Sequence, residues 1–132
     1  MNRVRWIFAM VAALALAGAC RDDPTAGAPR TGRLTVRLTT PNTDDGAMTF
    51  EVTGAPIDSV VVANPSLVLF TRRNGATIVG AVAGTLAGGA VVTLYVPDGE
   101  DAAGYSARVL EVADRQDLLR GSLAGYALTV TP

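Results

Sequence analysis

The chain contains no histidine, no lysine and a single cysteine, Cys20, among its 132 residues. A serine or cysteine nucleophile needs an adjacent base to become reactive, and histidine and lysine are the usual bases. Because both are missing, no serine here has the partners of a catalytic triad or of a serine–lysine dyad. The sequence therefore predicts no catalytic residue, and the serines are interpreted as residues of turns and strands. These serines are Ser59, Ser66, Ser106 and Ser122.

The same absences limit the metal sites that the chain can build. Zinc and copper sites use histidine and cysteine ligands, so no transition-metal site and no cofactor is predicted. Calcium takes oxygen ligands and stays open, because two predicted turns carry carboxylates. Neither turn has the ligand spacing of an EF-hand, and solvated loop carboxylates are the favoured interpretation. The five carboxylates are Asp44, Asp45, Asp98, Glu100 and Asp101.

The chain is also poor in positive charge and in aromatic side chains. Cleavage before Cys20 would remove two arginines and leave 9 arginines against 12 acidic residues, a net charge of −3. This balance lacks the basic footprint of a nucleic-acid-binding domain, so no nucleic acid partner is predicted. Paired carboxylates can hydrolyse glycosides, but such a site needs an aromatic-lined cleft, and the aromatic residues fall within predicted strands as core residues. They are Phe50, Phe70, Tyr95, Tyr105 and Tyr126.

The N-terminus has the composition of a targeting segment. Residues 1–5 contain two arginines, and residues 6–19 carry no charge, which is the pattern of a positive n-region followed by an apolar h-region. As a helix, the uncharged segment would span about 21 Å. That length is too short for a comfortable crossing of a bilayer core that is roughly 30 Å thick. Residues 1–19 are therefore interpreted as a signal peptide.

The end of this segment is Leu16-Ala17-Gly18-Ala19-Cys20. It resembles the lipobox of bacterial lipoproteins, in which small residues precede an invariant cysteine. The resemblance implies that Cys20 is diacylglycerol-modified, that the signal is cut just before it, and that the membrane is a partner through this lipid. The family usually has leucine three places before the cysteine, where this chain has Ala17. A plain secretory signal, and an uncleaved chain with a buried Cys20, are the alternatives.

Arg21 follows the cysteine, whereas the lipoprotein sorting rule associates inner-membrane retention with aspartate at that position. The resemblance therefore implies the outer membrane, with the domain facing the periplasm or the cell surface. Residues 20–32 are rich in proline, glycine, alanine and charge, and they are interpreted as a lipidated flexible linker. Residues 33–132 remain as one folded domain.

From residue 33 onward, short apolar runs alternate with turn signals, which is typical of a β-sandwich or barrel. Leu34, Val36 and Leu38 alternate with polar residues, as in a strand with one buried face. No helix of ten or more residues is visible between the runs, which argues against a doubly wound α/β fold. The predicted fold is all-β, an antiparallel sandwich of about eight strands. The predicted strands are 33–39, 48–53, 60–62, 66–73, 76–82, 90–96, 105–112 and 126–130.

Three local signals add detail. Asn74-Gly75 lies between two apolar runs and predicts a hairpin with a type I′ turn. The alternation breaks at residues 109–110, which indicates a β-bulge. Residues 114–120 begin with an aspartate that can act as an N-cap, and they are expected to form a short helix.

Three segments of the domain are LTVRL at 34–38, DGAMTFEV at 45–52 and GGAVVTLYV at 88–96. Together they resemble the cohesin-like class of bacterial sandwich domains. The closing LAGYALTV at 123–130 is similar to a group of small uncharacterised bacterial lipoproteins. Cohesins bind dockerin modules, but no partner-binding residue of that class can be matched here. The resemblance implies a sandwich and leaves its activity open.

The expected function is that of a lipid-anchored cell-envelope protein with a non-catalytic sandwich, in a structural role or in binding an envelope protein or glycan. The main alternative is a module that binds carbohydrate or a small ligand, and an enzyme ranks third. A protein-binding role predicts a broad apolar patch or a free sheet edge. A carbohydrate module predicts a groove with clustered exposed aromatic rings, and an enzyme predicts two carboxylates that converge in a pocket.

Overall fold

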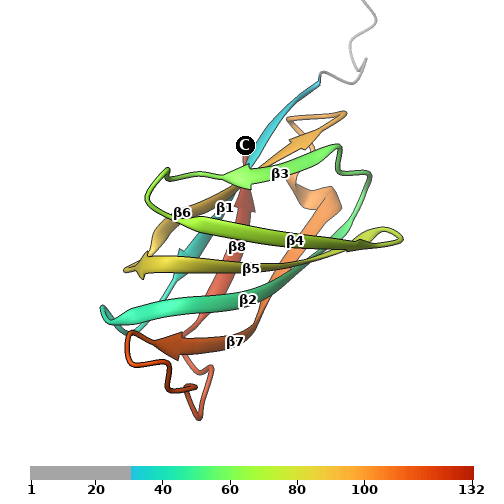
Figure 1. Cartoon of the computed structure of the whole chain (residues 1–132). Helices are drawn as coiled ribbons and strands as arrows, with labels where there is room; N and C mark the ends of the chain where they lie inside the picture. The colour runs from blue at the N-terminus through green and yellow to red at the C-terminus, as the bar shows by residue number, and fades with distance from the viewer. Residues whose placement is uncertain (1–30) are drawn as a thin grey trace, which may run out of the picture.

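The computed structural model describes residues 31–132 (Figure 1). They form eight strands and one 3₁₀ helix, which confirms the predicted all-β fold. The predictions for residues 1–19, for Cys20 and for the linker up to residue 30 lie outside the described residues. No helix in the described part of the chain is long and apolar enough to span a bilayer. The elements are β1 (Gly32–Thr39), β2 (Asp45–Gly54), β3 (Ser59–Val62), β4 (Val68–Asn74), β5 (Thr77–Leu86), β6 (Gly89–Val96), η1 (Ala102–Gly104), β7 (Tyr105–Asp114) and β8 (Ala127–Thr131).

The strands form two four-stranded antiparallel sheets, with orders β3-β6-β1-β8 and β4-β5-β2-β7. In Figure 1 the β4-β5-β2-β7 sheet lies in front, and its strands run across β1 and β8 of the other sheet. Only the β4–β5 connection stays within one sheet, and every other connection between consecutive strands passes from one sheet to the other. The sandwich is therefore held together by pairs between strands that are distant in sequence.

The core fills the space between the sheets and follows the period of two expected of strands. Leu34 and Val36 of β1 are fully buried, as the alternation in this strand predicted. Phe50 and Val52 of β2 are fully buried opposite them, and the ring of Phe50 lies under Gly80 of β5. A Cβ at Gly80 would overlap that ring, so glycine is needed there for the close approach of β5 to the core.

The β4–β5 hairpin forms at the predicted place, but with a different turn. Asn74 pairs with Thr77, so the two loop residues are Gly75 and Ala76. Gly75 has a φ of 61°, and Asp117 is the only non-glycine residue of the described chain with a positive φ. A type I′ turn needs positive φ at both central residues, whereas type II′ needs it only at the first. The φ values therefore fit type II′, and the predicted type I′ turn is wrong.

The helix predicted over residues 114–120 does not form. The Asp114 carboxylate accepts hydrogen bonds from the backbone N–H groups of Gln116 (2.8 Å) and Leu118 (3.0 Å), as an N-cap would. These bonds instead close a turn, after which the chain returns along β7 and Leu119 forms a bridge to that strand. An aspartate that caps its own backbone serves turns as well as helices, which is why the prediction was wrong.

Candidate functional site

Strand pairing brings small side chains to the middle of the outer face of the β4-β5-β2-β7 sheet. One row of register partners runs from Phe70 on β4 through Ala81 on β5 and Thr49 on β2 to Glu111 on β7. The register of β7 against β2 shifts at Leu110, which confirms the bulge predicted there. The shift keeps Glu111 on the outer face, opposite Thr49.

A second row lies beside the first and is entirely apolar. It runs from Val68 on β4 through Ala83 on β5 and Ala47 on β2 to Ala113 on β7. Leu119 extends the row beyond β7, because it bridges to Ala113. Three alanines thus lie between two large side chains, and the surface is low in the middle and raised at both ends.

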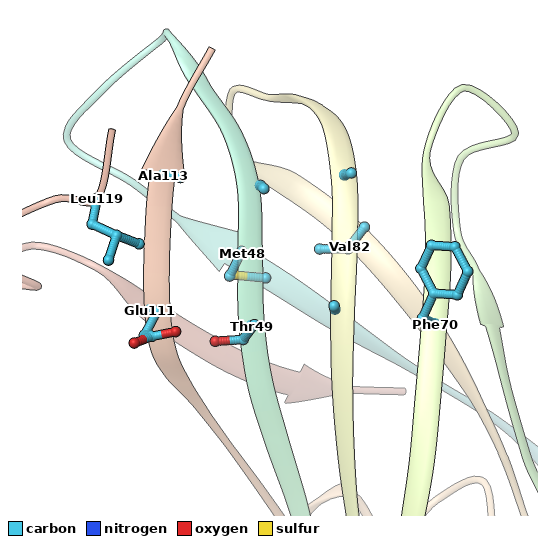
Figure 2. Close-up of a pocket in the computed structure, with 10 residues that line it drawn as sticks. Met48, Thr49, Phe70, Val82, Glu111, Ala113 and Leu119 are labelled. Carbon is cyan, nitrogen blue, oxygen red and sulfur yellow. The ribbon is translucent and has the colours of Figure 1, made fainter. Parts of the chain in front are cut away.

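Most residues of the two rows line a shallow apolar trough with a volume of about 150 Å³. Figure 2 shows Phe70 and Leu119 on opposite sides of the face, with β5, β2 and β7 between them. Phe70 is 69% exposed and Leu119 is 67% exposed, so the interpretation of Phe70 as a core residue is wrong. Thr49 and Glu111 are the only polar side chains of the lining. The trough is lined by Ala47, Met48, Thr49, Phe70, Ala81, Val82, Ala83, Glu111, Ala113 and Leu119.

The outer face of the β3-β6-β1-β8 sheet has a different character. Its central row consists of Thr35 on β1 with Thr93 on β6 and Thr131 on β8, and Arg33 and Arg37 flank it along β1. Hydroxyl and guanidinium groups thus cover this sheet where alanines cover the other. The exposed large apolar side chains of this sheet are Val61 and Tyr95, so the interpretation of Tyr95 as a core residue is also wrong.

A buried carboxylate holds the segment that carries one wall of the trough. Asp45, at the start of β2, is 0% exposed. It accepts hydrogen bonds from the hydroxyl groups of Thr40 (2.6 Å) and Tyr126 (2.9 Å) and from Nε (3.0 Å) and Nη2 (2.9 Å) of Arg120. Arg120 directly follows Leu119 in the chain. The ion pair therefore positions the Leu119 side of the trough.

The electrostatics of this pair favour a structural role. Burial alone would raise the pKa of Asp45, but hydrogen bonds from Thr40, Arg120 and Tyr126, together with the charge of Arg120, outweigh burial and lower that pKa below its ordinary value. The hydrogen bond to Asp45 in turn raises the pKa of Arg120. Both groups therefore stay ionised near neutral pH, where neither is suited to transferring protons.

The loop carboxylates that the sequence left open for calcium are engaged in protein contacts. Asp44 and Asp45 both form ion pairs with Arg120, and the interpretation of Asp45 as a solvated loop residue is wrong. Asp98 and Asp101 accept backbone hydrogen bonds within their own loop, at 3.0 and 3.1 Å. In the described part of the chain, no three acidic, histidine or cysteine side chains are grouped so that they could hold a metal ion.

Sequence reasoning missed the trough, although one strand carried a signal. Outward positions of β5 hold Val79, Ala81 and Ala83, and inward positions hold Ile78 and Val82. A strand that is apolar on both faces is typical of a sheet covered on both sides. Only the pairing with β2 and β7, however, brings alanines of three strands together into one floor.

Comparison of the chain with protein-family models, with curated proteins and with solved structures finds no match. Functional conclusions for this chain therefore depend on its own surface chemistry.

Proposed function

We propose that this protein is anchored by lipid in the bacterial cell envelope and that its sandwich binds a segment of a partner protein in the trough. The trough is the observation that carries the proposal, because Phe70 and Leu119 stand exposed on either side of an alanine floor. Soluble proteins rarely leave contiguous apolar patches uncovered, and such patches rimmed by polar residues mark interaction sites. The double-sided apolar pattern of β5 supports the same conclusion.

The chemistry of the trough favours a protein over a carbohydrate as its occupant. A carbohydrate site needs aromatic rings and several hydrogen-bonding groups, whereas this lining has one ring, Phe70, and two polar side chains, Thr49 and Glu111. The cores of protein–protein interfaces are apolar in the same way. The lining also holds a single carboxylate, which does not support an enzyme that uses a carboxylate pair.

The anchor is proposed from the lipobox-like residues that end at Cys20. Each buried CH₂ of an acyl chain contributes about 0.8 kcal/mol, and two chains hold a protein stably on a membrane. The anchor would thus keep the trough in the envelope.

The anchor is tested by metabolic labelling with palmitate. Wild type is expected to incorporate label, and Cys20→Ser is expected to incorporate none, because this residue is the only cysteine of the chain. Equal labelling of the two proteins would show that the lipoprotein assignment is wrong.

Binding is tested by purifying the native, anchored protein from envelope extracts. A stoichiometric partner protein is expected, and recovery of none would contradict the binding role.

A further inference from the structure

We propose that Glu111 determines which segments the trough accepts, so that the partner carries a cationic side chain beside the apolar residues that fill the trough. This inference rests on the proposed function, because it names the chemistry of the segment that the trough binds. Glu111 is the only ionisable side chain in the lining. It lies on β7 in the row of Phe70 and Ala81, as Figure 2 shows for the carboxylate and the ring.

Glu111 has no partner within the described chain. No hydrogen bond or ion pair joins its side chain to another residue there. In the adjacent outward-facing row, Glu51 on β2 pairs with Arg108 on β7, with Nε and Oε1 2.8 Å apart. The arginine in the row next to Glu111 is thus already engaged by another carboxylate.

The charges differ between the two edges of this sheet, with Arg72 on β4 and Glu111 on β7. Arg72 on β4 belongs to the same row as Glu51 and Arg108, and it also has no partner in the described chain. Three strand spacings of about 4.8 Å separate β4 from β7, or about 14 Å. This distance exceeds the Debye length of about 8 Å at physiological salt, so Arg72 does little to neutralise Glu111.

A segment that covers the trough would remove Glu111 from water. Burying a carboxylate without a partner is unfavourable, and a cation placed beside it offsets that penalty. A segment with lysine or arginine on the β7 side is therefore favoured, and one with an acidic residue there is repelled. Selectivity of this kind depends on the rejected partner as much as on the accepted one.

The test uses the processed, anchored protein in phosphatidylcholine nanodiscs, with surface plasmon resonance against empty nanodiscs as the reference. The probes are two acetylated and amidated decapeptides that share the same leucines and alanines and differ only in one lysine or one glutamate. The lysine peptide is expected to bind about tenfold more tightly, because the ion pair that it forms with Glu111 is withdrawn from water at the interface. Glu111→Gln is expected to remove this preference. Asp58→Asn, which removes one negative charge in the loop before β3, is the control and is expected to keep it.

The outcomes separate the two proposals. If neither peptide binds above the empty-nanodisc reference, the trough does not take apolar segments, and the proposed function is wrong together with this inference. If both peptides bind wild type equally, or if the preference survives Glu111→Gln, selection by Glu111 is wrong while binding in the trough stands. Loss of the preference in Asp58→Asn would also overturn it, because the effect would then follow net charge.

Discussion

Asp45→Asn is expected to lower the free energy of unfolding by about 3 kcal/mol, the range found when one partner of a buried ion pair is removed. The carboxylate is fully buried and accepts hydrogen bonds from Thr40, Tyr126 and Arg120. Asparagine keeps the shape of the side chain but loses the charge that balances Arg120. Its amide nitrogen, which is a hydrogen-bond donor, would also replace an oxygen that accepts hydrogen bonds. Urea denaturation at pH 7, followed by circular dichroism, measures the loss.

Asp44→Asn is the matched control, because Asp44 also forms an ion pair with Arg120. Its side chain is 55% exposed, whereas that of Asp45 is 0% exposed. Exposed ion pairs contribute about 1 kcal/mol or less, so the control is expected to lose no more than that. Similar losses in the two variants would show that burial of Asp45 is not what stabilises the sandwich.

The stability that Asp45 contributes is also expected to depend on pH. The pKa of Asp45 in the folded protein lies below its ordinary value of 3.8. As the pH falls below about 3.8, the unfolded chain binds a proton that folded Asp45 does not yet bind, so wild type loses stability. The contribution is complete above this range and is lost as the pH falls through the folded pKa. Asp45→Asn is expected to show a shallower loss of stability over the same pH range.

Ala81→Arg is expected to weaken partner binding by about thirtyfold or more, the effect of a change at the centre of an interface. Ala81 lies in the floor of the trough between Phe70 and Thr49. An arginine there would fill the trough and place a charge where the partner presents apolar groups, while its outward position spares the core. The measurement is the amount of partner recovered with the anchored protein from envelope extracts.

Thr93→Arg is the control for this variant, because Thr93 holds the corresponding central, outward position on the other sheet. It adds the same side chain to the face that carries threonines and arginines, and partner recovery is expected to stay at the wild-type amount. If partner recovery falls equally in the two variants, overall charge or anchoring causes the loss, and the trough is not the binding surface.

The strands could be predicted from the sequence because a period of two is a local signal. The alternation of Leu34, Val36 and Leu38 identified β1, and the break at residues 109–110 identified the bulge in β7. Turn chemistry was less decisive. Asp114 caps its own backbone in the manner of a helix N-cap, yet the chain after it pairs with β7 instead.

The candidate site could not be predicted, because it is made by pairing between distant strands. Ala47, Ala83 and Ala113 carry no functional signal individually, and they become one floor only when β2 pairs with both β5 and β7. Asp45 belongs to a cluster of turn-forming residues, and its burial depends on Arg120, which lies 75 positions further along the chain. A single sequence contains no information on such contacts that spacing or periodicity can reveal.

Binding of a protein partner in the trough is tested most directly by photo-cross-linking in living bacteria. A photoreactive amino acid is placed at Ala83, in the exposed floor of the trough, or at Thr93, on the outer face of the other sheet. One discrete cross-linked protein is expected from position 83, and none from position 93. The absence of a product at position 83, or the same product from both positions, would contradict binding through this face.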